Sequence, residues 1–255
     1  MINKINKLNN SLPQLKFRRF EFKYRIPRFL VDKITTDLLN YMEWDSFVIN
    51  KPEKFYQVSS LYFDSEGFGC YREKMAGVKD RKKLRLRIYS TILNPDMKIF
   101  VEIKRKRDMA ILKDRLIINY QDYLNILSKK PSVFLNNQLS TQEQDVWKEF
   151  LWIKRYNCMT PKVMVVYKRK PLMGRVNNKF RITFDSDIQA CPANQLDFFS
   201  RRRNVLFDDV IMELKYNNTI PDWFHFIIQK YQLNRVAFSK YCKSLEVCHK
   251  YYKYV

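Results

Sequence analysis

The sequence predicts an α+β protein in which a closed antiparallel β-barrel carries helices on its outside. Three observations predict this fold. Segments with strand-like alternation are numerous, and helical segments stand between them without the regular alternation of a parallel sheet. In five of the expected strands, one face is charged and the other is apolar. With 255 residues, 46% of them hydrophobic, the chain has enough apolar side chains for a large core.

The first half of the chain supplies most of the expected strands. Residues 1–16 form a flexible polar tail, and residues 17–255 contain no linker or repeat, so we expect a single domain there. Period-two alternation predicts strands at residues 17–26, 57–64, 81–89, 98–106 and about 114–118. Helical spacing after Pro27 predicts a helix at 28–42, and a shorter helix is expected at 65–75.

The second half combines helices with three further strands. Helices are expected at 120–128 and 140–156, and the second begins with the capping box Ser140-Thr-Gln-Glu143. The strands follow at residues 162–169, 180–185 and 210–216. Pro221 begins another helix that extends to about residue 231, and a last helix is expected at 239–252.

Alternation gathers the charges of five strands on one face each, because every second side chain of a strand points the same way. In the strand at 81–89, the other face consists of Leu84, Leu86 and Ile88. The charged faces are Glu21, Lys23 and Arg25; Arg81, Lys83, Arg85 and Arg87 with Tyr89; Glu102, Lys104 and Lys106; Arg181, Thr183 and Asp185; and Glu213 with Lys215.

Two arrangements would produce such faces. The common one is the solvated face of an open antiparallel sheet. The other is a barrel whose charged faces point inward around a cationic, water-filled tunnel. Two features favour the barrel. The pattern Glu-x-Lys occurs in three of the strands, and Arg85 lies beside Arg87, where like charges repel unless an anion neutralises them.

The net charge narrows the class of partner. The chain has 48 Lys and Arg against 26 Asp and Glu, a net charge of +22. Such an excess favours a polyanion, which could be nucleic acid, polyphosphate, a nucleotide or an anionic membrane. With four glycines, the chain has neither a P-loop nor a dinucleotide-binding glycine motif. Side chains must therefore bind the phosphate groups of any such partner.

Cysteine, histidine and apolar patterns disfavour other classes. The five cysteines form no C-x-x-C pair and the two histidines are far apart, which argues against a zinc site and against a disulfide framework. Unpaired cysteines indicate a reducing compartment, so we expect a cytoplasmic protein. The N-terminus lacks the apolar run of a signal peptide, and no segment approaches the roughly 20 apolar residues of a membrane span.

Cations mixed with a few carboxylates suit the chemistry of triphosphates. Arg and Lys bind non-bridging phosphate oxygens, and Arg often does so with two bonds. Carboxylates hold Mg²⁺ or Mn²⁺ directly or through water. Phosphoryl transfer depends mainly on positioning and on charge neutralisation, so the protein needs no special nucleophile.

Nine short motifs follow one another along residues 17–245. They are RRFEFKYRI (18–26), SLYFD (60–64), YREKMAG (71–77), RKKLRLRIY (81–89), FVEIKRK (100–106), VYKR (166–169), RITFD (181–185), MELKY (212–216) and FSKY (238–241). In this order they resemble the VTC (vacuolar transporter chaperone) domain, a family of the triphosphate tunnel metalloenzyme, or CYTH-like, superfamily. A single motif such as Glu-x-Lys would be weak evidence, whereas the ordered set is specific.

The resemblance implies a fold, an activity and a site. The family fold is an antiparallel β-barrel tunnel, and its active members are polyphosphate polymerases that move the γ-phosphate of ATP onto a growing chain. It implies ATP and inorganic polyphosphate as partners, and Mn²⁺ or Mg²⁺ as cofactor. It implies catalytic roles for Arg85, Arg87, Lys104 and Lys23, substrate binding by Arg169, Arg181, Lys215, Ser239 and Lys240, and metal binding by Glu213, then by Glu21 and Glu102.

The sequence departs from the family in two respects. Active members often carry a further Lys two residues before the Ser-Lys pair, and this chain has Ala237 there. The chain also lacks the SPX regulatory domain and any transmembrane segment of family members, so it resembles a stand-alone catalytic domain. Regulation and coupling to transport across a membrane are therefore not implied for it.

Other functions stay open. A hydrolase of tripolyphosphate, or of a nucleoside or RNA 5′-triphosphate, is disfavoured because that branch typically has Glu-x-Glu-x-Lys in its first strand, where this chain has only Glu21-Phe-Lys23. A non-catalytic polyphosphate-binding module is the third alternative, because of Ala237. General nucleic-acid binding is the weakest, since it predicts cations on an open face. Peripheral membrane contact through the basic last helix is also left open.

Overall fold

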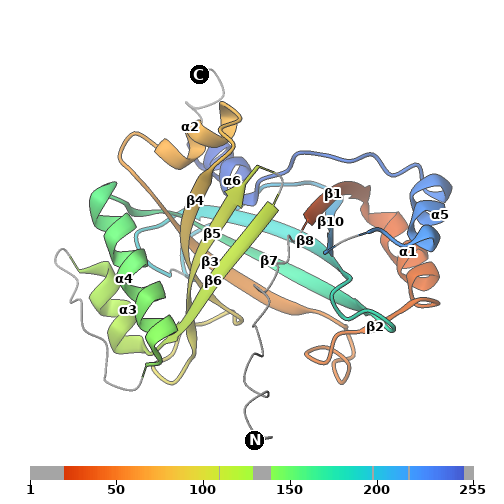
Figure 1. Cartoon of the computed structure of the whole chain (residues 1–255), viewed down its shortest axis with the longest axis horizontal. Helices are drawn as coiled ribbons and strands as arrows, with labels where there is room; N and C mark the ends of the chain where they lie inside the picture. The colour runs from red at the N-terminus through yellow and green to blue at the C-terminus, as the bar shows by residue number, and fades with distance from the viewer. Residues whose placement is uncertain (1–19, 109, 129–138, 197, 218, 250–255) are drawn as a thin grey trace, which may run out of the picture.

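The computed structural model describes residues 20–108, 110–128, 139–196, 198–217 and 219–249, and it confirms the α+β class (Figure 1). Strands of this part of the chain are β1 (Phe20–Pro27), β2 (Met42–Trp44), β3 (Tyr56–Asp64), β4 (Arg81–Ile88), β5 (Ile99–Arg107), β6 (Ala110–Ile118), β7 (Thr160–Gly174), β8 (Arg181–Pro192), β9 (Arg203–Asn204) and β10 (Asp209–Tyr216). All of them join one antiparallel sheet.

The sheet follows the order β1-β10-β8-β7-β3-β4-β5-β6, with β2 paired to β7 and β9 paired to β8. Ladder pairing extends β6, β7 and β8 well beyond the alternating segments that predict them. No sequence pattern predicts β2 and β9, which have three and two residues. Such short strands exist only through their partners, so their own residues carry little signal.

The expected closed barrel is not what the ladders show. β1 and β6 are the two ends of the strand order, and no ladder joins them within the described residues. The free edge of β1 is bound instead by the segment that precedes the last helix, through a bridge between Tyr24 and Arg235 and a 2.8 Å bond from the Val236 N–H to the Lys23 carbonyl. The structure is therefore a curled antiparallel sheet, or half-barrel, with its concave face turned inward.

Helices surround this sheet. They are the 3₁₀ turn η1 (Arg28–Leu30), α1 (Val31–Leu38), α2 (Gly69–Met75), α3 (Tyr120–Leu127), α4 (Thr141–Tyr156), α5 (Asp222–Lys230) and α6 (Lys240–Cys248). Most of them lie on its apolar face, whereas α6 begins on the concave side, where Tyr241 packs against Tyr62 of β3. In Figure 1, α3 and α4 lie together at one end of the molecule, and α1 and α5 lie together at the other. The predicted capping box is confirmed, because Ser140 and Glu143 bond each other's backbone at the start of α4.

Two apolar cores correspond to these two groups of helices. The first packs α3, α4 and α6 against β3, β4, β5 and β7, and the predicted apolar face of Leu84, Leu86 and Ile88 is fully buried in it. The second packs α1 and α5 against β1, β8 and β10. Because helices occupy the apolar face, the charged faces of the strands point to the concave side.

The first helix is shorter than predicted. It ends at Leu38, and Met42, which its apolar spacing assigns to the helix, instead begins β2 opposite Gly174 of β7. A single buried apolar residue satisfies a strand as well as a helix, and the partner strand decides between them. The helix predicted at 65–75 likewise begins late, at Gly69, because Phe68 has a left-handed backbone (φ 55°).

Some predicted features lie outside the described residues. These are the tail at 1–16, the start of the first strand at 17–19 and the end of the last helix at 250–252. Within the part that is described, no helix is both long enough and apolar enough to cross a membrane.

Candidate functional site

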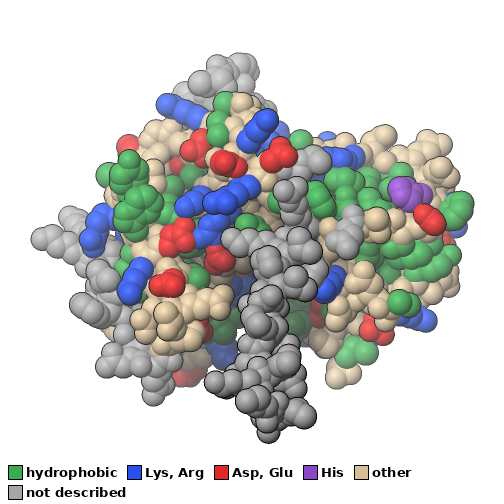
Figure 2. Space-filling view, in the orientation of Figure 1, with side chains coloured by type: hydrophobic (Ala, Val, Ile, Leu, Met, Phe, Trp, Pro, Cys, Tyr) green, Lys and Arg blue, Asp and Glu red, His purple; other side chains and the backbone are tan. Residues whose placement is uncertain are grey.

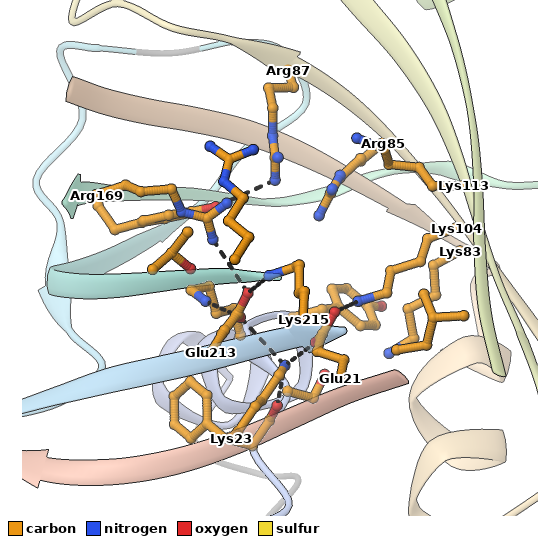
Figure 3. Close-up of a pocket in the computed structure, with 18 of the residues that line it drawn as sticks. Glu21, Lys23, Lys83, Arg85, Arg87, Lys104, Lys113, Arg169, Glu213 and Lys215 are labelled. Carbon is orange, nitrogen blue, oxygen red and sulfur yellow. Dashed lines mark hydrogen bonds and ion pairs between the residues drawn. The ribbon is translucent and has the colours of Figure 1, made fainter. Parts of the chain in front are cut away.

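The concave face of the sheet surrounds a cavity of about 1310 Å³ (Figure 3). Of the described residues, 17 Lys and Arg side chains line it, against only two carboxylates, those of Glu21 and Glu213. The cations come from seven strands, from α2 and α6, and from connecting segments. Cations that the sequence places on separate strands therefore meet around one space, and their faces do not form an open solvated surface.

A wall of cations from β4 and β6 surrounds the carboxylate of Glu102. Arg85 Nε donates to Glu102 Oε2 at 2.6 Å, and Arg115 Nη2 donates to Oε1 at 2.6 Å. Lys113 Nζ lies 3.3 Å from Oε1, and Arg87 Nη1 lies 3.8 Å from Oε2. Burial raises the pKa of Glu102, but these cations outweigh it and hold that pKa well below its usual range.

Hydroxyl groups hold the same arginines from the neighbouring strands. Arg85 Nη1 donates to the Tyr62 hydroxyl at 3.0 Å, whereas Arg87 donates to Tyr167 at 3.3 Å and to the Ser60 Oγ at 3.1 Å. Burial raises the pKa of Tyr62, but the two guanidinium groups outweigh it and lower the pKa to about 8. The orientation of both arginines is therefore fixed before any ligand binds.

Glu213 of β10 connects cations from four elements. Lys215 Nζ donates to its Oε2 at 2.6 Å, and Lys240 Nζ donates to its Oε1 at 2.7 Å. Lys23 of β1 lies 3.5 Å away, and Arg169 of β7 donates at 3.4 Å. Burial raises the pKa of Glu213, but the cations hold it well below its usual range, so the carboxylate stays ionised.

Asp185 of β8 is a second centre of pairing next to Glu213. Arg169 donates two bonds to its oxygens, at 2.6 and 2.7 Å, and Lys240 forms an ion pair with it. Asp185 is fully buried, and the Lys240 residue is 7% exposed. A buried carboxylate and two buried cations stay charged together because each satisfies the others.

Glu21 joins the two halves of the curled sheet. Its Oε1 lies 3.1 Å from Lys23 Nζ on the same strand, and its Oε2 lies 3.5 Å from Lys104 Nζ on β5. The second contact crosses from one edge strand to the strand beside the other edge (Figure 3). Burial lowers the pKa of Lys104 to about 8, although Glu21 opposes the effect. Lys104 therefore loses its charge at a lower pH than an ordinary lysine, and a bound anion would stabilise its charged form.

The start of α6 brings Ser239 and Lys240 to the cavity. Ser239 is the N-cap of the helix and accepts the Cys242 N–H at 3.3 Å, while Lys23 Nζ donates to the Phe238 carbonyl at 2.8 Å. Ala237 also lines the cavity and contributes no charge to it.

Arg181 and Thr183 of β8 offer unused hydrogen-bonding atoms to the cavity. Arg181 Nη2 lies 3.0 Å from an Asp45 carboxylate oxygen, and it donates to the Tyr56 hydroxyl at 3.5 Å. The Arg181 Nε and the Thr183 Oγ1 are buried and have no hydrogen-bond partner. Buried polar atoms are rarely left unpaired, so a ligand or water is expected to complete them.

Comparison with known protein families decides the membership of this chain. Residues 18–249 match the VTC domain. The chain belongs to the VTC domain family. Membership of this family suggests a polyphosphate-related function for the VTC domain. No curated protein matches the sequence.

Solved structures show more distant likenesses. A proposed adenylyl cyclase from Hippeastrum with a dominant triphosphatase activity has a TM-score of 0.49 and 14% identity, over 88% of this chain and 93% of that one. A proposed adenylate cyclase from Bacillus halodurans has a TM-score of 0.45 and 11% identity, over 88% and 95%. A Pyrococcus horikoshii protein has a TM-score of 0.45 and 11% identity, over 89% and 97%. Likenesses this low leave the activity of the VTC domain open.

The VTC domain brings together nearly all of its predicted site residues. The residues that line the cavity are Lys23, Arg85, Arg87, Lys104, Arg169, Arg181, Lys215, Ser239, Lys240, Glu21 and Glu213. Glu102 does not line it and lies behind the arginines. The prediction omits Lys113 and Arg115, because the strand expected at about 114–118 is too short to show that they alternate with apolar residues on β6.

The donor set of the VTC domain suits a divalent cation that the substrate also helps to hold. No group of three or more His, Cys, Asp or Glu is placed to bind a metal within the described residues. Glu21 and Glu213, however, both line the cavity and share Lys23 as a neighbour. Two carboxylates leave most positions of a Mg²⁺ or Mn²⁺ ion to phosphate oxygens and water, as is usual for such ions at nucleotide sites.

Proposed function

We propose that this VTC domain is a metal-dependent ATP–polyphosphate phosphotransferase, which moves the γ-phosphate of ATP onto the end of a polyphosphate chain inside a cationic tunnel. The observation that carries the proposal is the lining of the cavity, with 17 cations and two carboxylates among the described residues. Transfer of a phosphoryl group depends on positioning and on neutralising charge at its oxygens, and this lining can supply both.

Phosphate groups would replace the carboxylates as partners of the lysines. In the structure, Lys23, Lys215 and Lys240 all approach Glu213. Their side chains are flexible, so they can turn from this shared carboxylate to the oxygens of an entering chain. Burial opposes charge on Lys104, and a bound phosphate would restore it by attraction. The ion pairs with Glu213 therefore keep these cations near the positions where the substrate would need them.

The residues divide into two groups by what they would bind. The first would clamp the phosphoryl group in transfer and consists of Arg85, Arg87, Lys104 and Lys23. The second would hold the remaining phosphates and the chain end and consists of Arg169, Arg181, Lys215, Ser239 and Lys240. The rigid arginines suit oriented, two-bond contacts, whereas the lysines suit a chain that must slide after each transfer.

A Mn²⁺ or Mg²⁺ ion would be held by Glu213 and Glu21. When bound, it would neutralise charge on the phosphate oxygens during transfer. Lys23 lies between the two carboxylates and would keep them from repelling each other in its absence. The free cysteines of the chain agree with a reducing, cytoplasmic location, which we propose on that ground.

A polyphosphate-binding module without activity is the second candidate function. Ala237 favours it, because it lines the cavity two residues before Ser239 and contributes no charge there. With 17 cations still lining the cavity, the loss of one more would weaken phosphate binding little, but it could prevent transfer by misplacing the reacting phosphoryl group. Binding and turnover must therefore be measured separately.

The first test is synthesis of polyphosphate from ATP and Mn²⁺ by the purified chain, followed by gel electrophoresis and by release of ADP. Lys104→Ala removes a cavity cation whose side chain is 31% exposed, so the fold should tolerate it. Lys168→Ala is the matched control, because Lys168 lies on β7, pairs with Asp187 and does not line the cavity. We expect the first variant to slow synthesis by about 10²-fold, the loss typical of one electrostatic group, and the second to leave it unchanged.

The outcomes separate the candidate functions. Polymer from the natural chain and from Lys168→Ala, with little from Lys104→Ala, would support the phosphotransferase. Release of inorganic phosphate without polymer would favour a hydrolase. Absence of turnover, with retention of polyphosphate on the protein in a filter assay, would favour the binding module and reject the phosphotransferase.

A further inference from the structure

Glu102 differs from the other carboxylates predicted to bind metal. Glu21 and Glu213 line the cavity, whereas Glu102 does not and has an exposed fraction of 0%. Its three-residue motif is nevertheless the same Glu-x-Lys that occurs on β1 and β10. The motif alone therefore does not distinguish the three carboxylates, and the fold separates them.

The surroundings of Glu102 come entirely from the two neighbouring strands. β5 lies between β4 and β6, with Glu102 opposite Arg85 on one side and opposite Arg115 on the other. On β1 and β10, by contrast, the lysine of the motif pairs with the glutamate of the same strand. Lys104, the lysine of the β5 motif, pairs with Glu21 instead. Both oxygens of Glu102 are thus free for the cations of β4 and β6.

These cations cover the carboxylate on its cavity side. Arg85 and Arg115 donate to different oxygens at 2.6 Å, and Lys113 and Arg87 complete the shell. All four cations line the cavity that Glu102 itself does not reach. A metal ion would have to displace at least one guanidinium to bind Glu102, leaving a buried cation unpaired.

Asp185 likewise lies behind cations that line the cavity. It has an exposed fraction of 0% and does not line the cavity, while both of its partners, Arg169 and Lys240, do. Two independent carboxylates, on β5 and β8, therefore stand behind cavity cations. Among the described residues, Glu21 and Glu213 are the only carboxylates that line the cavity.

We propose that Glu102 and Asp185 are positioning residues, which hold the phosphate-binding cations from behind, and that neither binds the metal ion. The three arginines alone leave the Glu102 cluster with a net charge of +2. It therefore still attracts phosphate, while the carboxylate reduces repulsion between neighbouring arginines and fixes their planes. Preorganised charges of this kind need no rearrangement when the ligand arrives. The inference rests on the proposed function only in that the cavity binds a phosphate chain.

The first measurement is the affinity for the β,γ-imido analogue of ATP in EDTA, by calorimetry, so that neither turnover nor metal contributes. Glu102→Gln is compared with Asp187→Asn, which removes a carboxylate that pairs with Arg28 and Lys168 outside the cavity. We expect Glu102→Gln to weaken binding about 10- to 100-fold, the range found for the outer-shell partners of metal ligands. Asp187→Asn should leave the affinity unchanged, because none of its partners lines the cavity. Equal affinity of Glu102→Gln and the natural chain would overturn the proposal.

The second measurement is binding of Mn²⁺ to each protein saturated with the same analogue, followed by the loss of the free-ion signal in electron paramagnetic resonance. The Mn²⁺ affinity should fall in Glu213→Gln, which removes a carboxylate that lines the cavity, and stay unchanged in Glu102→Gln. A fall in Glu102→Gln as large as that in Glu213→Gln would show that Glu102 is a metal ligand and would refute our assignment.

Circular dichroism and a melting curve check the fold of each variant. If Glu102→Gln does not fold, Glu102→Asp replaces it, since it keeps the charge but shortens the side chain by one methylene. A positioning residue then predicts weaker binding of the analogue with unchanged Mn²⁺ affinity, and a metal ligand predicts the reverse. Because both measurements are of binding, they hold whether or not the chain makes polymer, so the proposal and the phosphotransferase can fail independently.

Discussion

Arginine side chains of the cavity wall are repeatedly paired with tyrosine hydroxyl groups. Four arginines that line the cavity each bond a tyrosine hydroxyl, in the pairs Arg85–Tyr62, Arg87–Tyr167, Arg115–Tyr89 and Arg181–Tyr56. A tyrosine ring is rigid and well packed, so its hydroxyl is a fixed acceptor. The lysines of the cavity instead share carboxylates, as around Glu213. Arginines are therefore the oriented part of the site and lysines the adaptable part.

Lys113 gives the site a dependence on pH. Burial lowers its pKa to about 7; Arg115, Arg85 and Arg87 add to the effect, and Glu102 opposes it. Lys113 is thus cationic below about pH 7 and neutral above it. Between about pH 6 and 7.5, tripolyphosphate affinity should fall more steeply for the natural chain than for a variant without Lys113, because Lys104 and Tyr62 titrate nearer pH 8 and an ordinary lysine with a pKa near 10.4 would not titrate there. Calorimetry across this range measures the slope.

Lys113→Met is the variant that tests this dependence. This variant removes the titrating group but keeps the length of the side chain. Its tripolyphosphate affinity should be lower than that of the natural chain below pH 7 and about equal to it above pH 7. Lys168→Met, outside the cavity, should retain the slope of the natural chain. If Lys113→Met keeps that slope, another group titrates and the assignment to Lys113 is wrong.

At the scale of elements, α6 is fixed to the sheet by a buried hydrogen-bond network. The Tyr241 hydroxyl donates to the carboxylate of Asp64, which ends β3 and also accepts the N–H groups of Cys70 and Tyr71 at the start of α2. Asp64 is fully buried. The network therefore sets the position of α6, whose first residues Ser239 and Lys240 reach the cavity.

Tyr241→Phe should loosen this connection without a cavity in the core. It leaves the buried Asp64 short of one donor, so the free energy of unfolding should fall by about 1–3 kcal/mol, as measured by urea denaturation. Tyr231→Phe is the matched control, because its hydroxyl bonds Asp37 at the partly exposed contact between α5 and α1. A loss in Tyr241→Phe no larger than in Tyr231→Phe would show that Asp64 does not depend on α6.

The strands and the pairing of the elements differ in how far the sequence predicts them. Alternation over eight or nine residues predicts β1, β3, β4, β5 and β10 nearly to the residue. It predicts which residues share a face, and so most of the cavity lining. Alternation cannot predict that β1 and β6 do not pair with each other. The edge of β1 is bound instead by Arg235 and Val236, which lie far along the chain. The sequence also does not predict that Glu21 lines the cavity and Glu102 does not, since the position of Glu102 depends on cations from two other strands.

At the scale of the whole molecule, charge and apolar surface are distributed unequally. In Figure 2, cations and carboxylates lie intermixed over the part formed by β5 and β6, and hydrophobic side chains gather over α1 and α5. Positive charge is more concentrated in the cavity than on this surface, because 17 cations and two carboxylates line the cavity among the described residues. A net charge of +22 repels itself, and the repulsion is strongest where the charges converge. A ligand that neutralises the cavity should therefore stabilise the fold.

Inorganic polyphosphate should raise the melting temperature of the natural chain more than sulfate does at the same ionic strength. A ligand at about 100 times its Kd adds about 2.7 kcal/mol to the free energy of unfolding, which corresponds to a rise of about 5–10 °C for a protein of this size. Sulfate screens charges without spanning several cations, so its effect should be smaller. The difference should shrink as salt is added, because exposed cations are screened within about 10 Å at 0.1 M. It should also shrink in Lys104→Ala and persist in Lys168→Ala, since only the first lysine lines the cavity. An equal rise with sulfate, or an equal loss in both variants, would mean that the surface of the molecule as a whole, and not its cavity, binds the polyanion.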